Sequence, residues 1–145
     1  MKQTIFAAIL VIATTAASFA GGNKANTALL NNINAAFKNA AGVKWVNTAA
    51  TKKATFSFNG KETSALYDVN DDQFIGFSTH YAANELPQTV TDGLQKKYAD
   101  WTIQDASMLV DYNGYISYFV QVAKGDNSLV LKVTPDGKAQ IYGRP

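Results

Sequence analysis

The chain has 145 residues, of which 47% are hydrophobic and 17% charged, and its net charge is only +2. This composition is typical of a globular protein rather than a disordered or fibrous one, and it has no basic excess that would neutralise the phosphates of a nucleic acid. Cys is absent and His occurs once, which excludes disulfides, thiol catalysis, Cys-ligated metals and His-rich metal sites.

The first twenty residues have the pattern of a secretory signal peptide. One Lys precedes an uncharged run over 5–17, and Ser18 and Ala20 are small residues at positions −3 and −1 of a cleavage site. The apolar run of about 13 residues is shorter than the roughly 20 needed to span a bilayer, which disfavours a transmembrane anchor. We expect cleavage after Ala20 and export of 21–145 as a single domain, periplasmic or secreted, with no membrane insertion afterwards.

The first half of this domain predicts one helix and four strands. Asn26 or Thr27 is a suitable N-cap, and an apolar stripe through Leu29, Ile33 and Phe37 predicts a helix over 27–40. The strands are expected at about 43–48, 53–58, 62–69 and 74–81. Between the second and third of them, Asn59-Gly60 is typical of a type I′ hairpin.

The second half predicts the same order of elements. Pro87 suits the first turn of a helix, on which Val90, Leu94 and Tyr98 repeat the earlier apolar spacing. Strands are expected at about 101–104, 107–112, 115–123, 128–134 and 138–142, the first two being either separate or one bent strand. The fold class is therefore α+β: two tandem duplicated units, about 26–82 and 83–145, form one curved antiparallel sheet with the helices on one face.

Strand alternation predicts which side chains face away from the helices. Expected on the helix side are Phe56, Phe58, Ala65, Tyr67, Val69, Ile116, Tyr118, Val120, Val122, Leu129, Leu131 and Val133. A two-residue turn at Asn113-Gly114 would place an aromatic cluster on the open face, namely Met108, Tyr112, Tyr115 and Phe119. The open face of the first half is expected to be more polar, with Thr55, Ser57, Glu62, Ser64 and Leu66. The aromatic cluster is either an interaction site or a set of cross-strand pairs that only stabilises the hairpin.

Three short segments resemble exported PepSY-like proteins, also described as β-lactamase-inhibitor-like and common in Bacteroidetes. Residues 37–45 (FKNAAGVKW) resemble the family's helix-end signature, and 67–72 and 132–138 are similar to its repeated hairpin. The resemblance implies the tandem fold with helices on one face of a curved sheet. In the inhibitor branch, it implies an open sheet face that grips an enzyme and an acidic loop that enters the active site. Those inhibitors have disulfides and this chain has no Cys, so no inhibitory residue is carried over.

Two segments have partial motifs for other chemistry. Residues 68–72 begin like a calcium loop, but Gln73 and Thr79 stand where such a loop needs Gly and Glu, so we expect a hairpin turn with an acidic tip formed by Asp68, Asp71 and Asp72. Ser78 and His80 share one side of a strand, but neither an orienting acid nor an oxyanion site is evident.

We therefore expect a protein that is not an enzyme and has no metal or cofactor. Its predicted function is that of an exported binding module that docks on another envelope or extracellular protein or peptide, as an inhibitor or regulator of an envelope enzyme. The partner-binding residues are predicted to be the open-face aromatic cluster and the acidic tip. The alternative is a periplasmic small-ligand binder that uses the same face.

Overall fold

The computed structural model describes residues 24–145, so the signal peptide over 1–20 lies outside the described residues and stays a prediction. The elements of the described chain are α2 (Thr27–Asn39), β1 (Lys44–Asn47), β2 (Thr51–Phe58), β3 (Lys61–Asp68), β4 (Phe74–Tyr81), the 3-10 helix η2 (Ala83–Glu85), α3 (Gln88–Tyr98), β5 (Thr102–Asp111), β6 (Ile116–Lys124), β7 (Asn127–Val133) and β8 (Ala139–Gly143). The predicted bounds agree with these to within two residues at every end. The short helix η2 was not expected.

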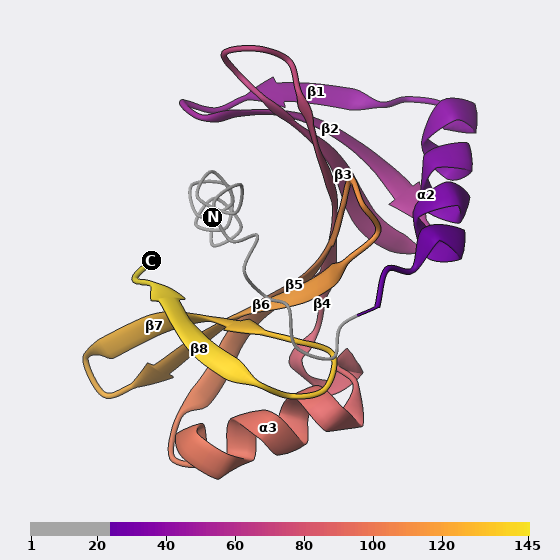
Figure 1. Ribbon diagram of the computed structural model, residues 1–145. Coiled ribbons are helices and arrows are strands. Elements are labelled where there is room, and N and C mark those ends of the chain that lie inside the picture. Colours follow the sequence, from indigo (N-terminus) through magenta and orange to yellow (C-terminus); the bar gives the residue numbers. More distant parts are fainter. Residues whose placement is uncertain (1–23) are drawn as a thin grey trace.

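The eight strands form one antiparallel sheet in which every strand pairs with its neighbours in the sequence, from β1 to β8. The sheet is strongly curved, and both α-helices lie on its convex side (Figure 1). Pairing of β4 with β5 joins the two predicted halves into a continuous sheet. A helix and four strands follow one another twice, which is the order that a tandem duplication requires; the duplication itself stays a prediction.

The main apolar core lies between the two α-helices and the convex face. Asn26 caps α2 by accepting the Leu29 N–H at 2.9 Å. The buried residues Ile33 of α2 and Val90 and Leu94 of α3 all belong to one cluster with strand side chains. Among the predicted inward residues, the buried members of this cluster are Phe56, Ala65, Tyr118, Val120, Val122, Leu129, Leu131 and Val133. The helical spacing and the strand alternation therefore identified most of the core correctly.

A second apolar cluster lies on the concave face. Its buried members come from five consecutive strands: Leu66, Ile75, Leu109, Phe119 and Val130. The ring of Tyr142 on β8 meets that of Phe119 edge-on, with the centroids 4.9 Å apart. Leu66 and Phe119 are both 0% exposed, so the prediction that they are exposed on this face is wrong. Side chains converge on the inner side of a curved sheet, and that is why apolar residues there cover one another.

The hairpin between β5 and β6 has a three-residue loop over 112–114 instead of the predicted two-residue turn. The N–H of Asp111 donates to the Tyr115 carbonyl at 3.0 Å. The Asp111 carboxylate accepts the N–H groups of Asn113 and Tyr115, each at 2.9 Å. Gly114, at φ +90°, provides the left-handed residue that closes a loop of this length.

This loop moves the register of β5 against β6 by one residue. Met108 pairs with Tyr118 and Val110 with Ile116, all four on the convex side. Because side chains alternate between the two faces, a shift of one residue transfers the whole set to the other face. The prediction of Met108 on the open face is therefore wrong: Met108 is buried in the main core.

The hairpin between β2 and β3 follows the sequence prediction. Asn59 and Gly60 both have positive φ angles, +51° and +77°. Phe58 pairs with Lys61 across this two-residue turn. Both the type I′ geometry and the register of the first half are therefore confirmed.

Helix α3 is seated on the β7–β8 turn by a backbone contact that has no room for a side chain. A Cβ atom on Gly93 would lie 1.9 Å from the Gly137 carbonyl oxygen, and one on Gly137 would lie 2.5 Å from the Thr89 carbonyl oxygen. Beside this contact, the Thr89 hydroxyl donates to the Pro135 carbonyl at 2.7 Å.

Replacing Gly93 with Ala should push α3 away from the turn. We expect the free energy of unfolding to fall by about 3 kcal/mol, at the upper end of overpacking costs, as measured by urea titration. Gly143→Ala in β8 is the matched control, because no atom lies within 4 Å of its added Cβ. Equal stability of the two variants would contradict the close packing of α3.

Tyr118 predicts how the fold responds to alkaline pH. Its ring is 6% exposed and meets the Tyr81 ring 6.2 Å away, and burial, followed by the charge of Tyr81, raises the pKa of Tyr118 to about 12. A pKa above its unfolded-state value stabilises the fold below pH ~10, and this contribution is lost between pH ~10 and ~12. As the pH rises from 9 to 12, the free energy of unfolding measured by urea titration should therefore fall less for Tyr118→Phe than for the unmodified protein. Tyr112→Phe, with a ring 63% exposed, should behave like the unmodified protein.

Candidate functional site

The concave face of strands β2 to β5 carries a polar pocket. Seven side chains line it, three of them serines and four ionisable: Lys53, Glu62, Ser64, Ser78, His80, Asp105 and Ser107. They face this side because they alternate with residues of the main core, as Ser107 does between Ala106 and Met108. Ser64 and Ser107 are buried while Glu62 and His80 are exposed, so hydroxyl groups form the floor and charged groups the rim.

The strand register arranges the pocket in order along the strands. Lys53 pairs with Leu66 and lies at one end. Ser64 and Ser78 pair with each other in the middle. Toward the other end His80 pairs with Ser107, and Glu62 and Asp105 follow. The pocket therefore has a cation at one end, hydroxyl groups in the middle and carboxylates at the opposite end.

Ser107 has a buried hydroxyl group with no hydrogen-bond partner. The residue is 4% exposed, and its Oγ is the single such side-chain atom within residues 24–145. Other hydroxyl groups on the sheet are paired: the oxygens of Thr55 and Ser64 lie 3.0 Å apart, as do those of Thr63 and Thr79. Buried polar atoms in folded proteins nearly always have a hydrogen-bond partner. The unpaired Ser107 hydroxyl group therefore indicates that a polar group of a ligand could bind beside it.

His80 and Asp105 are hydrogen-bonded to each other on the pocket rim. The His80 Nε2 lies 2.7 Å from the Asp105 Oδ1, which also accepts the Ala106 N–H at 3.0 Å. Asp105 lies two residues before Ser107 on β5, so strand alternation places it on the same face as His80 and Ser107. His80 is therefore bonded to an acid that is distant in the sequence, and no hydrogen bond joins it to Ser78 in the described part of the chain.

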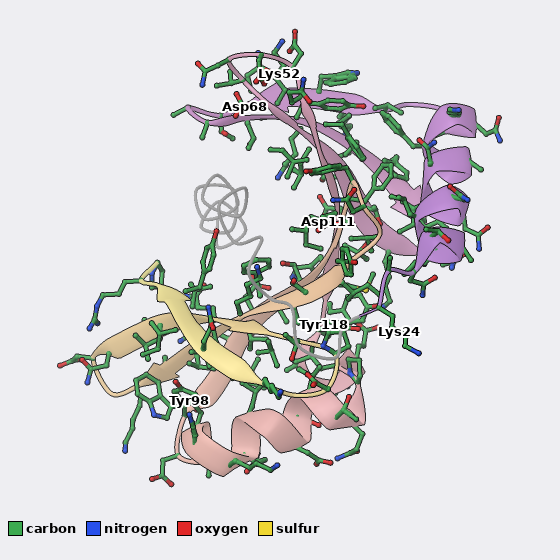
Figure 2. The ribbon with its side chains drawn as sticks, in the orientation of Figure 1. Lys24, Lys52, Asp68, Tyr98, Asp111 and Tyr118 are labelled. Carbon is green, nitrogen blue, oxygen red and sulfur yellow. The ribbon has the colours of Figure 1, made fainter. Side chains whose placement is uncertain are left out.

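The predicted acidic tip is a hairpin turn whose carboxylates are engaged within it. Asp68 accepts the Asn70 N–H at 2.7 Å, and Asp71 accepts the Gln73 N–H at 3.1 Å. Asp72 lies 2.5 Å from the Lys52 ammonium group. Figure 2 shows Lys52 and Asp68 together at this end of the sheet. The three carboxylates stabilise a tight turn, and Asp72 adopts a positive φ of +59° there.

The predicted aromatic cluster is divided by the structure. Tyr112 and Tyr115 are 63% and 41% exposed at the β5–β6 loop, whereas Met108 and Phe119 are buried on opposite faces of the sheet. The Tyr112 N–H donates to the Ile75 carbonyl at 3.1 Å, close to where β4 begins. The exposed tyrosines and the acidic turn therefore lie at the same end of the sheet, although they come from different hairpins.

The sequence contained a signal for part of the pocket. Thr55, Glu62 and Ser64 were expected on the open face as a polar set, and the alternation that placed them there also applies to Lys53 and Ser78. The partners from β5 could not be identified in this way, because the predicted register of the β5–β6 hairpin places Met108 on the open face and therefore Ser107 on the helix side.

Comparison with solved structures identifies the fold. A BLIP-like protein from Bacteroides fragilis is similar with a TM-score of 0.62 and 21% identity over 83% of this chain and 86% of that one. A DUF2874 family protein from Bacteroides ovatus has a TM-score of 0.62 and 20% identity, over 83% of this chain and 89% of that one. A protein from Bacteroides eggerthii, provisionally described as periplasmic, has a TM-score of 0.60 and 20% identity, over 81% of this chain and 89% of that one. No protein-family model and no curated protein matches the chain. The β-lactamase-inhibitor-like fold implied by the resemblance is therefore supported, while membership of a PepSY-like family stays a prediction.

Residues 24–145 have neither a metal-ligand cluster nor a helix suited to crossing a membrane. No group of three or more His, Asp or Glu side chains in this part of the chain is placed to hold a metal ion. None of the helices described has the length and apolar character that crossing a membrane requires.

Replacing Ser107 with Ala tests whether its hydroxyl group is unsatisfied. Removal of an unpaired buried polar group relieves a desolvation cost of about 1–3 kcal/mol, so we expect Ser107→Ala to be as stable as the unmodified protein or more stable in urea titrations. Ser117→Ala on the same face, where the side chain is only half-buried, is the matched control and should change stability little. A loss of more than about 1 kcal/mol for Ser107→Ala would show that its hydroxyl group has a stabilising partner.

Proposed function

We propose that this chain is a non-catalytic, exported binding module that docks on another protein or peptide through the concave face of its sheet. The observation that carries this proposal is the exposure of Tyr112 and Tyr115 at one end of a sheet face on which neither α-helix packs. Large exposed aromatic side chains provide much contact area at low entropic cost and are enriched at interfaces. The signal-peptide pattern of residues 1–20 and the periplasmic description of a structural relative support export.

The described part of the chain offers little for catalysis. Ser107 is the serine that pairs with His80 across the strands, but its hydroxyl group has no hydrogen-bond partner, so no base is placed to activate it as a nucleophile. The BLIP-like description of a structural relative is consistent with an inhibitor or regulator of an envelope enzyme, which we include in the proposal.

A second candidate function is the binding of a small polar ligand in the pocket. The unsatisfied hydroxyl group of Ser107 favours it, because a ligand with a polar group could complete the missing hydrogen bond. In that case the exposed tyrosines would have no part in binding. Substitutions of the tyrosines therefore test protein docking, and substitutions in the pocket test ligand binding.

The binding surface can be tested by affinity capture from an envelope extract. Mature 21–145 should retain a partner that the Tyr112→Ser/Tyr115→Ser variant does not, because that variant lacks both exposed rings. Trp45→Ser is the matched control: Trp45 is 58% exposed on β1 and lies on the convex side beside Tyr67, so its loss should leave capture unchanged. Equal capture by all three proteins would remove the tyrosine end of the sheet from the interface.

Phe119 is unsuitable for this experiment, and its own substitution has a different expected outcome. Phe119 is 0% exposed at the centre of the concave cluster, so Phe119→Ser should lower the free energy of unfolding by about 3–5 kcal/mol, as deletions of buried rings do. Tyr112→Ser should change it by less than about 0.5 kcal/mol, typical of exposed positions. Urea titration of the two single variants measures this difference, and comparable losses would contradict the burial of Phe119.

A further inference from the structure

We propose that the polar pocket binds a short extended peptide by its two free ends, with the peptide carboxylate at Lys53 and the peptide ammonium group at Glu62 and Asp105. This inference rests on the proposed function and deepens it, because it gives the concave face a ligand of defined chemistry. It uses residues that lie apart from the tyrosines at the end of the sheet.

Two charged side chains of the pocket, Lys53 and Glu62, lie apart and have no partner among the described residues. Within residues 24–145, Lys53 has no ion pair or hydrogen bond through its ammonium group, and neither has Glu62 through its carboxylate. Two neighbouring lysines do have partners: Lys52 lies 2.5 Å from Asp72, and Lys61 lies 2.5 Å from Glu85. An unpaired cation and an unpaired anion at the two ends of one pocket are complementary to a ligand that carries the opposite charges at its own ends.

The backbone spacing of Lys53 and Glu62 along the strands is similar to the length of a short extended peptide. Lys53 pairs with Leu66, and Glu62 lies four residues along the same strand from Leu66. At about 3.3 Å per residue, their backbone positions are therefore about 13 Å apart along the strand direction. An extended chain covers at most about 3.3–3.6 Å per residue, so about four residues bridge this distance. A single amino acid, whose charges are adjacent, is too short.

The floor between the charged ends suits a peptide backbone. A serine hydroxyl group has one donor and two acceptor positions, and Ser64, Ser78 and Ser107 line the floor, although Ser64 uses one position on Thr55. Ser107 in particular has no partner within the described chain and is buried, so a bound N–H or carbonyl group would satisfy it. Small side chains also leave room for a main chain to approach the sheet closely.

Hydrogen bonds on the rim hold the Asp105 carboxylate in place at the acidic end. Asp105 uses its Oδ1 for both His80 and the Ala106 N–H, and its Oδ2 has no partner in the described residues. This second oxygen remains able to accept from an ammonium group. His80 is thereby a positioning residue, because it holds the Asp105 carboxylate without needing to touch the ligand.

The test is a titration of the whole mature protein with tetra-alanine, followed by NMR chemical shifts. The peptide with free ends should bind, and acetylation of its amino end or amidation of its carboxyl end should each weaken binding by about tenfold, the effect of losing one charge-assisted hydrogen bond.

Protein variants test which residue recognises which end of the peptide. Lys53→Met should bind the carboxyl-amidated peptide and the peptide with free ends equally. In Glu62→Gln, acetylation of the amino end should weaken binding less than it does in the unmodified protein. Dialanine should bind more weakly than tetra-alanine. Lys96→Met, at an exposed position in the last turn of α3, is the control and should leave every affinity unchanged.

The results separate this inference from the proposed function. Absence of binding by tetra-alanine, or equal binding of the free and the doubly capped peptide, would overturn the peptide site. Equal effects of Lys53→Met and Lys96→Met would overturn it as well, since the interaction would then follow net charge. None of these outcomes affects capture of a partner through Tyr112 and Tyr115, and loss of that capture would leave the peptide titration unaltered.

Discussion

The burial of two helical apolar stripes against one face of one sheet is the interaction on which the rest of the structure depends. Ile33 from the first helix and Val90 and Leu94 from the second enter a single core with strands from both halves. Without disulfides, this core is the main source of stability in a chain of this length. Because both α-helices are used on the convex side, the concave side is formed by strands alone, and its side chains carry the features that distinguish this protein.

The concave face has two different parts. Over β2 to β5 it is hydrophilic, with serines under charged groups, and from β3 across to β8 an apolar stripe runs through Leu66, Leu109 and Phe119. The two parts meet on β5, where Ser107 and Leu109 are neighbours on the same face. A partner that covers this face would therefore encounter polar recognition and apolar contact side by side, the usual combination of a specific binding surface.

The sequence allowed the elements and most of the convex core to be predicted, because helical spacing and strand alternation are local signals. It did not reveal the register of β5 and β6, since Asn113-Gly114 has the composition of a two-residue turn while the Asp111 carboxylate stabilises a three-residue loop. The register that follows from the three-residue loop places Met108 in the core. The pocket was recognised only as a polar set on β2 and β3, because its remaining members depend on pairing across β4 and β5. Asp105 could not be assigned to it, since it shares a face with Ser107, which the predicted hairpin register places on the helix side.

The pairing order of the sheet also determines how the chain can fold. Since every strand pairs only with its predecessor and its successor, each loop that must close is short or contains a helix, and the entropy of loop closure stays small. Topologies dominated by such near-neighbour pairings fold faster than those that join distant segments. A chain that emerges from its amino end, from a ribosome or a translocation pore, can therefore add each strand to an edge that is already present. The last strand, β8, then completes the seat of α3, because the Gly93–Gly137 contact forms only when the β7–β8 turn closes.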